Sequence, residues 1–373
     1  MEDIKKGLEN VIALETQITY IDGEKGILEY RGYNVNELSK LSYETVSYLI
    51  INGKLPDGNE FESFSNQLKK ERAIDDGTVD ILKMCNLDIE AIDALRTAIS
   101  YLSHHDSDLN DHSYEANMRK AVRLIAKFPT IVAAYYRIKN NQEPISPDAS
   151  LSHGANFLYM LKGEKPDGVE AKLIDLDFIL STEHELNAST FSTRITASVL
   201  SDIYSAIITG LSTLKGSLHG GARMEVMKML DDVSSPENAE QHVLDLIEDN
   251  QRIMGFGHRV YKTYDPRARI YKSLARHISE ERGDTRWLEI AERIEEVAHR
   301  ELVEKRGKDI RPNVDFYSAV VYKYLEIPPE FASAIFAIGR VSGWIAHCME
   351  QYADNRVIRP RAKYVGEHGL KVE

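Results

Sequence analysis

The sequence is poor in cysteine, in proline and in long apolar stretches. Its 373 residues include two cysteines, Cys85 and Cys348, and 11 prolines. Two cysteines far apart in the chain provide no disulfide framework, which favours a reducing compartment, and we expect a cytoplasmic protein. No run of about 18 apolar residues occurs, so no membrane-spanning helix is expected. Residues 1–7 lack the apolar stretch of a secretory signal peptide.

Basic residues are fewer than acidic ones. The chain holds 46 Lys and Arg against 59 Asp and Glu, which gives a formal net charge of −13. General nucleic-acid binders and proteins of anionic membrane surfaces carry a basic excess, so we expect neither partner. The hydrophobic fraction of 43% is ordinary for a globular protein. A chain of this length forms one large domain or two unequal ones.

Helical periodicity is the dominant pattern. Apolar residues recur at steps of three and four in residues 92–102 and again in residues 193–214. The second stretch predicts one long helix packed deep between its neighbours. Further amphipathic helices are expected at residues 239–248, 268–281, 287–304 and 331–338. The sequence therefore predicts an all-α fold.

Turn and breaker residues mark the limits of several elements. Residues 17–21 and 27–30 flank the pair Asp22-Gly23, which predicts one short β-hairpin near the N-terminus. Pro129 is expected to kink or end a helix that begins near Met118. Asp265 followed by proline has the pattern of a helix start, with aspartate as N-cap.

A locally basic stretch interrupts the acidic chain between residues 252 and 276. Its basic residues are Arg252, Arg259, Lys262, Arg267, Arg269, Lys272 and Arg276, and Asp265 is the only acidic residue among them. The stretch is compatible with a solvated helix face and with a site for an anionic ligand. The segment Gly255-Phe256-Gly257-His258-Arg259 favours the ligand site, because glycines allow close backbone approach and His258 can donate or shuttle a proton. A dinucleotide-binding loop is not indicated, since the third glycine and the preceding strand are missing.

Two further segments contain residues suited to proton chemistry. His219 lies in Gly-Ser-Leu-His-Gly-Gly-Ala, where glycines on both sides allow a sharp helix-to-helix turn that exposes the imidazole. Asp315 lies in Pro-Asn-Val-Asp-Phe-Tyr-Ser, at an expected helix start. Taken singly, each is also compatible with a structural role, as a hydrogen-bonded histidine or a helix cap.

Taken together, these segments resemble the motifs of the citrate synthase family. The similar segments are the two around His219 and Asp315, the segment GFGHRVYK around His258, and the segments EHELNAS, GRVSGWIAH and RPR at residues 183–189, 339–347 and 359–361. They follow the family's order over nearly the whole chain, from Gly7 to the segment RPRAKYVG. The chain is most similar to the short bacterial and archaeal members.

The resemblance implies a citrate synthase-like fold that is almost entirely helical, with a minor N-terminal hairpin. A large, dimer-forming domain would comprise residues 1–220 and 327–373. A smaller helical domain, residues 221–326, would be inserted between these parts and would close over the active site to exclude water.

The resemblance also implies the reaction. A citrate synthase condenses acetyl-CoA with oxaloacetate and water to give citrate and CoA, the first reaction of the tricarboxylic acid cycle. Asp315 would remove a proton from the thioester methyl group, which requires that the enolate be stabilised as it forms. His219 would donate a hydrogen bond to the thioester oxygen, and His258 would polarise the ketone of oxaloacetate and protonate the new alkoxide.

Arginines would bind the two carboxylates of oxaloacetate, because guanidinium groups match carboxylates with paired hydrogen bonds. The resemblance assigns this role to Arg267, Arg340 and Arg359, with His184 as a further substrate contact. Arg359 would reach into the neighbouring subunit's site, which implies a homodimer.

CoA would bind as a cosubstrate, and the resemblance implies no permanently bound cofactor and no metal. Arg259 and Lys262 are the candidates for its phosphates, with Arg306 and Lys308 as alternatives. The partners expected are therefore small molecules and a second copy of the chain.

Three other functions remain open from the sequence. A 2-methylcitrate synthase would use propionyl-CoA, and one methylene changes binding by only about 1–3 kcal/mol. A metal-dependent hydrolase would use the polar stretch His104, His105, Asp106, Asp108, Asp111 and His112, although that spacing fits no metal motif and favours a solvated loop. An inactive helical scaffold is disfavoured because His219, His258 and Asp315 occur together with the arginines.

Overall fold

The computed structural model describes residues 4–372 and confirms an all-α fold. The first group of helices comprises α1 (Val35–Leu38), α2 (Tyr43–Asn52), α3 (Gly58–Glu71), α4 (Asp76–Met84), α5 (Ala91–His104), α6 (Tyr114–Lys139), α7 (His153–Lys162), α8 (Gly168–Ser181), α9 (Ala188–Ser198) and α10 (Ile203–Leu214). The second group comprises α11 (Ala222–Val233), α12 (Ala239–Glu248), α13 (Pro266–Arg282), α14 (Arg286–Ala298), α15 (Val314–Tyr324) and α16 (Ala332–Ala353). Short 3₁₀ turns lie at Lys6–Leu8, Pro236–Asn238 and Pro329–Phe331, and a π-helical turn at His299–Glu304.

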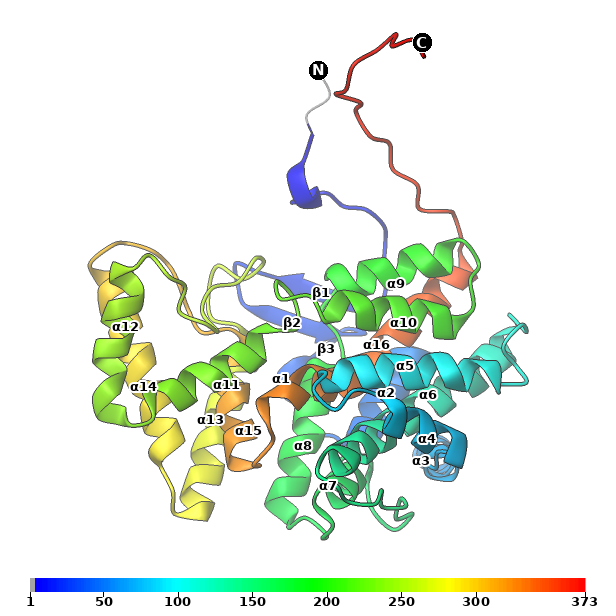
Figure 1. Cartoon of the computed structure of the whole chain (residues 1–373), viewed down its shortest axis with the longest axis horizontal. Helices are drawn as coiled ribbons and strands as arrows, with labels where there is room; N and C mark the ends of the chain where they lie inside the picture. The colour runs from blue at the N-terminus through cyan, green and yellow to red at the C-terminus, as the bar shows by residue number, and fades with distance from the viewer. Residues whose placement is uncertain (1–3, 373) are drawn as a thin grey trace.

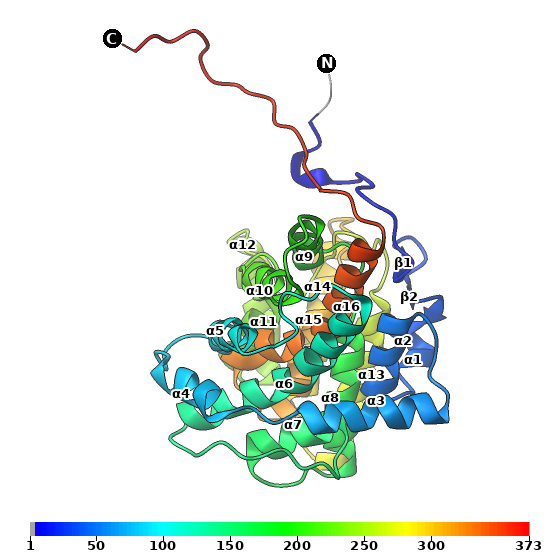
Figure 2. The same ribbon diagram turned by 90° about the vertical axis from the view of Figure 1, so that its right-hand side faces the viewer.

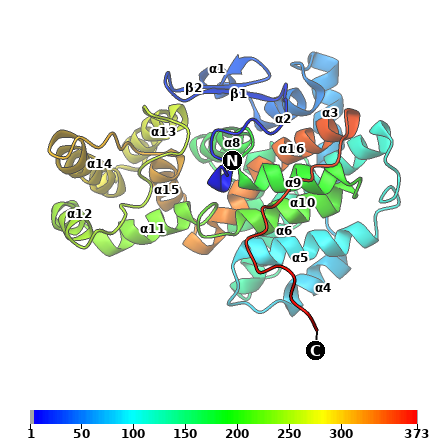
Figure 3. The same cartoon turned by 90° about the horizontal axis from the view of Figure 1, so that it is seen from above.

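The helices form two groups in space. Figure 1 shows α11–α15 on one side and α2–α7 with α9, α10 and α16 on the other, and Figure 3 shows the same separation from above. Helix α8 lies between these two spatial groups and contacts α13 on one side and α16 on the other. Both ends of the chain leave the body on the same side, as Figure 2 also shows.

The predicted hairpin is confirmed. Strands β1 (Thr19–Asp22) and β2 (Ile27–Tyr30) pair antiparallel, with Thr19 opposite Tyr30. A two-residue strand, β3 (Tyr33–Asn34), extends the sheet and was not predicted. Leu28 and Tyr30 of β2 are fully buried, so the sheet packs one face against the helical core.

Helix α16 forms the centre of the larger group. It packs against α2, α5, α6, α8, α9 and α10. Two glycines allow α16 to approach the end of α8 closely. A Cβ at Gly339 would lie 2.5 Å from the Phe178 carbonyl oxygen, and a Cβ at Gly343 would lie 2.2 Å from the Thr182 carbonyl oxygen. The stretch Pro329–Ala353 is long and apolar enough to cross a membrane, but 94% of its most apolar window is buried inside the protein.

Two helix predictions were wrong. Residues 193–214 form two helices, α9 and α10, because Leu200 adopts a left-handed backbone conformation with φ of 59°. Asp202 then caps α10 by accepting a hydrogen bond from the Ser205 backbone N–H. Val199, expected in the buried face, is 59% exposed in this link.

Helix α6 does not end at Pro129 and begins earlier than expected, since Ser113 caps it at Tyr114. It continues to Lys139 with its central residues buried against α3, α5, α7 and α16. Tertiary packing therefore outweighs the loss of one backbone hydrogen bond at the proline. The start of α13 agrees with the sequence, because the Asp265 carboxylate accepts from the Arg267 backbone N–H.

Candidate active site

A cleft of about 750 Å³ opens beside α11 and α16. Seven of the predicted site residues line it, namely His184, His219, His258, Arg259, Arg267, Asp315 and Arg340. They come from segments that are far apart in the sequence, including both helix groups. The structure thus brings together all three residues proposed for proton chemistry and two of the three arginines proposed for oxaloacetate.

His219 lies in the turn between α10 and α11, as the flanking glycines predicted. The Gly220 backbone N–H donates to the Leu214 carbonyl at 2.8 Å and closes this turn. A Cβ at Gly220 would lie 2.4 Å from the same carbonyl oxygen, so a larger residue would open it. The tight turn therefore fixes where the imidazole enters the cleft.

The segment before His258 is joined to the segment before Asp315. The Asn313 backbone N–H donates to the Gly255 carbonyl at 2.8 Å, and the Asn313 side chain donates to the Gly257 carbonyl at 3.0 Å. Gly255 has a positive φ of 80°, and a Cβ there would lie 2.9 Å from Phe316. Asn313 also caps α15 through the Asp315 backbone N–H. These bonds hold His258 and Asp315 at one end of the cleft.

Backbone contacts fix the tautomer of His258. Its Nδ1 accepts hydrogen bonds from the backbone N–H groups of Val260 at 2.9 Å and Tyr261 at 3.2 Å. An accepting Nδ1 carries no proton, so in the neutral ring the proton is on Nε2. Burial lowers the pKa of His258 to about 4, with Asp265 opposing and Arg267 adding to the shift. His258 is therefore a neutral hydrogen-bond donor at pH 7.

His219 is also neutral at pH 7. Its Nε2 lies 2.8 Å from the Ser189 hydroxyl. Within the part of the chain that the structure describes, its Nδ1 has no hydrogen-bond partner and is available in the cleft. Burial, followed by the positive charge of Arg340, lowers the pKa of this imidazole to about 4.

Positive charge surrounds His184. Its ring centroid lies 5.2 Å from that of His258, and its Nε2 lies 3.3 Å from the Tyr261 hydroxyl. Burial and the charge of Arg267 hold its pKa well below the ordinary value. Burial also lowers the pKa of Arg340 to about 10, and the Arg340 Nε donates to the Ser181 carbonyl at 2.7 Å.

Asp315 is the carboxylate of the cleft. Burial raises its pKa above the ordinary value, and the positive charges of Arg223 and Arg267 oppose that increase. The Arg223 Nε lies 3.6 Å from the Asp315 Oδ1. Asp265 differs, because its carboxylate is bound by both Nε and Nη2 of Arg267. Asp315 is thus the carboxylate suited to accept a proton.

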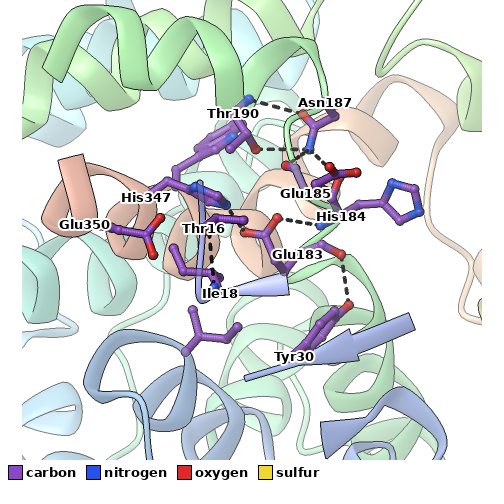
Figure 4. A network of polar contacts seen from close by, with 12 residues as sticks. Thr16, Ile18, Tyr30, Glu183, His184, Glu185, Asn187, Thr190, His347 and Glu350 are labelled. Carbon is purple, nitrogen blue, oxygen red and sulfur yellow. Dashed lines mark hydrogen bonds and ion pairs between the residues drawn. The ribbon is translucent and has the colours of Figure 1, made fainter. Parts of the chain in front are cut away.

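Figure 4 shows buried polar residues behind His184 that the sequence analysis missed. The Glu183 carboxylate accepts from the His184 backbone N–H at 2.7 Å and lies 3.2 Å from the His347 Nε2. Arg194 lies 3.2 Å from the His347 Nδ1, and because arginine only donates, His347 carries its proton on Nε2, toward Glu183. Glu183 and His347 lie in the segments EHELNAS and GRVSGWIAH, which resemble family motifs. The motifs could therefore have identified both residues, although neither stands out by its own chemistry.

Several predicted residues lie outside the cleft. Lys262 pairs with Glu24 and is 75% exposed. Arg359 lies in the extended, exposed segment that follows α16 and does not line this chain's own cleft. Lys308 and Arg306 are exposed and do not line it either.

The basic stretch 252–276 is not one anion site. Lys272 and Arg276 pair with Glu295 and Glu292 on α14, whereas Arg259 and Arg267 line the cleft. Its helical part is therefore closer to the solvated face that the sequence left open.

The histidine and aspartate stretch that suggested a hydrolase forms the link between α5 and α6. Asp106 and Asp108 pair with Arg123 at 2.8 and 2.6 Å, and Asp108 also pairs with Arg119. Within residues 4–372, no group of three or more His, Cys, Asp or Glu side chains could hold a metal ion. The loop expected from the sequence is confirmed.

The fold is all-α, and its cleft combines arginines, which suit anionic ligands, with imidazole and carboxylate groups, which suit proton transfer. The family model described as "Citrate synthase, C-terminal domain" matches residues 7–361. The chain belongs to the citrate synthase family, a family of transferases.

Three relatives illustrate the similarity. A citrate synthase of Haloferax volcanii is 44% identical over 99% of this chain and 97% of its own length. A protein of Bacillus subtilis named citrate/2-methylcitrate synthase is 39% identical over 96% of each chain. The citrate synthase of Thermoplasma acidophilum, solved as a ternary complex with carboxymethyl-CoA and oxaloacetate, superposes with a TM-score of 0.93 at 34% identity, covering 100% of this chain and 98% of that one.

Proposed function

We propose that this chain condenses acetyl-CoA with oxaloacetate and hydrolyses the resulting citryl-CoA to citrate and CoA. The observation that carries the proposal is the meeting of Asp315, His219 and His258 in one cleft with Arg267 and Arg340. It is supported by the family match and by the relatives named citrate synthase.

Asp315 takes a proton from the methyl group of acetyl-CoA. A carboxylate is a weak base for this carbon acid, so the developing enolate oxygen needs a donor in place. In the structure the Ser189 hydroxyl donates its one proton to the Asn187 Oδ1 at 2.7 Å, so its oxygen accepts from the His219 Nε2. His219 supplies the donor from Nδ1, the nitrogen available in the cleft, once the Ser189 proton turns to Nε2 and the ring proton lies on Nδ1. Removal of one such donor typically lowers the rate by about 10²–10³.

The enol carbon then attacks the ketone carbon of oxaloacetate. His258 donates its Nε2 proton to the ketone oxygen as the new carbon–carbon bond forms, because its Nδ1 is held by two backbone N–H groups. Water then cleaves the thioester of citryl-CoA and releases CoA as a thiol.

Arg340 and Arg267 bind the carboxylates of oxaloacetate. Arg340 uses its Nε on the Ser181 carbonyl, which leaves its two terminal amino groups for a ligand. Arg267 is oriented by its paired hydrogen bonds to Asp265. His184 lies against His258 and is a further contact in the same part of the cleft.

Arg259 is our candidate for binding a CoA phosphate, because it lines the cleft. Lys262 is the alternative, although it is exposed and paired with Glu24. We place the protein in the cytoplasm, since Cys85 and Cys348 are free thiols.

Residues 221–326 are proposed as a smaller domain that closes on a larger one made of 1–220 and 327–373, since both parts line the cleft.

The enzyme is proposed to be a homodimer in which Arg359 completes the neighbouring site. The segment after α16 is extended and carries exposed apolar residues, among them Tyr364 at 64% and Val365 at 86% exposure. Exposed apolar side chains on an extended arm suit contact with a second copy.

Mixing two inactive variants tests this dimer. Hybrid dimers of Arg359→Gln and Asp315→Asn would have one site with both changes and one with neither. After subunit exchange we expect about a quarter of wild-type activity, because half of the dimers are hybrids with one intact site. No recovery in dimers shown to have exchanged would contradict a shared site.

The primary assay is thiol release from acetyl-CoA. Release that depends on oxaloacetate, with citrate as the product, is the expected result. An inactive scaffold would release no thiol with any acyl-CoA, and that outcome would overturn the proposal.

A second candidate activity is 2-methylcitrate synthesis. The Bacillus subtilis relative whose name includes both products favours testing it. The ratio of kcat/KM for acetyl-CoA and propionyl-CoA decides between them, and we expect the larger value for acetyl-CoA.

A further inference from the structure

The side chain of Arg223, in α11, lies between two carboxylates. Its Nη1 donates to the Asp177 Oδ1 at 2.8 Å, and its Nε lies 3.6 Å from the Asp315 Oδ1. Arg223 is 1% exposed, and its guanidinium lies 4.8 Å from the ring centroid of Tyr322 and 5.3 Å from that of Phe336. A buried cation therefore sits directly behind the candidate base.

Asp177, in α8, is the principal partner of this cation. It is fully buried and accepts hydrogen bonds from the hydroxyls of Tyr271 at 2.6 Å and Tyr322 at 2.7 Å. Tyr322 in turn accepts from the Arg223 Nη1 at 2.7 Å. A guanidinium and two hydroxyls thus compensate the Asp177 charge, as a carboxylate so deep in the protein requires.

The donors of Arg223 are not all used. Its Nε and Nη2 are buried and have no hydrogen-bond partner among the described residues. A guanidinium has five N–H donors in a fixed plane, so the edge turned away from Asp177 remains available. The carboxylate close to that edge is Asp315, at 3.6 Å from Nε, which is beyond a hydrogen bond but within strong electrostatic range.

We propose that Arg223 is a positioning residue for the condensation, and that its charge, shared between Asp177 and Asp315, sets the basicity of Asp315. The inference rests on the proposed function, in which Asp315 is the base. Asp177 draws much of the Arg223 charge to itself, so that Arg223 stabilises the carboxylate form of Asp315 without making it too weak a base for a carbon acid.

Among the charges around Asp315, Arg223 and its partner Asp177 have the main influence on the basicity of Asp315. Burial raises the pKa of Asp315, and Arg223 lowers it more than Arg267 does. The charge of Arg267 is largely cancelled by Asp265, which binds it with two hydrogen bonds. The other charged and titratable groups that line the cleft or act on this cluster are His184, Glu185, His219, His258, Arg259, Asp265, Arg267, Tyr271, Tyr322 and Arg340.

Two substitutions should move the pH profile in opposite directions. Arg223→Gln removes the positive charge, so the acid limb of kcat/KM for acetyl-CoA, measured with saturating oxaloacetate, should move to higher pH by about 1–3 units. Asp177→Asn removes the competing carboxylate, so the same limb should move to lower pH by about 1 unit. Arg223→Lys keeps the charge and should shift the limb less than Arg223→Gln. A purely structural role would lower activity without opposite shifts.

Two further variants complete the test. Tyr322→Phe removes one of the two hydroxyls that compensate Asp177, so Asp177 should draw more of the Arg223 charge and the limb should move to higher pH, in the direction of Arg223→Gln. This variant tests the proposal even if the charge variants do not fold. Arg123→Gln is the matched control, because Arg123 also pairs with two carboxylates, Asp106 and Asp108, but lies outside the cleft. It should leave the acid limb unchanged.

The outcomes separate this inference from the proposed function. No oxaloacetate-dependent thiol release by the wild-type enzyme would overturn the proposed function and this inference together. With an active wild-type enzyme, the role of Arg223 would be overturned, and the proposed function left in place, if folded Arg223→Gln and Asp177→Asn did not shift the acid limb in opposite directions, or if folded Tyr322→Phe did not shift it.

Discussion

The cleft and the loop between α5 and α6 are both rich in histidine and aspartate, but the structure uses them differently. In the cleft, His219 and His258 are largely buried, and each has a pKa lowered to about 4. In the loop, His104, His105 and His112 are exposed. Asp106 and Asp108 of the loop are bound by arginines, whereas Asp315 lines the cleft.

The difference shows that density of chemical groups in the sequence does not define a site. The stretch gathers six such residues within nine positions of the chain, yet two of its three aspartates, Asp106 and Asp108, are bound by arginines of α6. The cleft gathers residues from distant segments and surrounds them with protein, which shifts their pKa values. Burial and convergence therefore distinguish the two regions.

The sharpest test of this comparison makes the same substitution in both regions. Asp315→Asn removes the base and should lower kcat by about 10³ or more. Asp108→Asn, the matched change in the loop, should leave kcat within about twofold, because its carboxylate is already paired with Arg119 and Arg123. Steady-state thiol release measures both. Comparable losses in the two variants would contradict the distinction.

A smaller loss is expected for a hydrogen-bond donor of the cleft. His219→Gln should lower kcat by about 10²–10³ with a lesser effect on KM, because the lost bond forms mainly in the transition state. His105→Gln, an exposed histidine of the loop, is the control and should retain wild-type kinetics. A change in KM alone for His219→Gln would show that it only binds substrate.

Burial of neutral imidazoles also predicts acid sensitivity. The pKa values of His153, His219 and His258 are lowered to about 3, 4 and 4, from 6.5. Between pH 6.5 and those values the unfolded chain binds protons that the folded chain does not, so stability falls as the pH falls. Each group should cost about 1–2 kcal/mol by pH 5.

Urea denaturation at pH 7 and pH 5 measures this loss. His153 lies outside the cleft, buried beside Tyr43 and Phe178, so His153→Phe removes one titrating ring without touching the candidate site. The variant should lose less stability between the two pH values than the wild type does. Equal losses would show that burial of this ring does not control its protonation.

The smallest effect is expected from removal of metal ions. A chelator should leave oxaloacetate-dependent thiol release unchanged, since Asp106 and Asp108 of the loop are bound by arginines and the proposed chemistry uses side chains of the cleft. Loss of activity on chelation, restored by a divalent cation, would revive the hydrolase interpretation of the loop.

Much of the fold could be predicted because its signals are local. The cap at Asp265 and the amphipathic helix Ala239–Glu248 depend on neighbouring residues, and both agree with the structure. The break at Leu200 could not be derived from apolar spacing, which continues through it, although the Asp202 cap was a usable signal. The passage of α6 through Pro129 depends on helices distant in sequence.

The candidate site divides in the same way. His219 and His258 could be singled out because each lies beside glycines, which indicate a tight turn or a close backbone approach. Arg223 and Asp177 could not, since neither lies in a recognisable pattern and their meeting depends on the packing of α11 against α15 and of α13 against α8. Whether Arg359 enters a site depends on a second chain, so it stays a prediction.

The position of α16 has a consequence for biosynthesis. This helix fills the middle of the larger group, yet it follows α2 to α10 in the chain and leaves the ribosome after them. Until residues 332–353 emerge, helices α2 to α10 have no central partner for their apolar faces, at synthesis rates of about 5–20 residues per second. The nascent chain therefore passes through a stage of exposed apolar surface, during which it depends on chaperones more than a protein whose core is completed early.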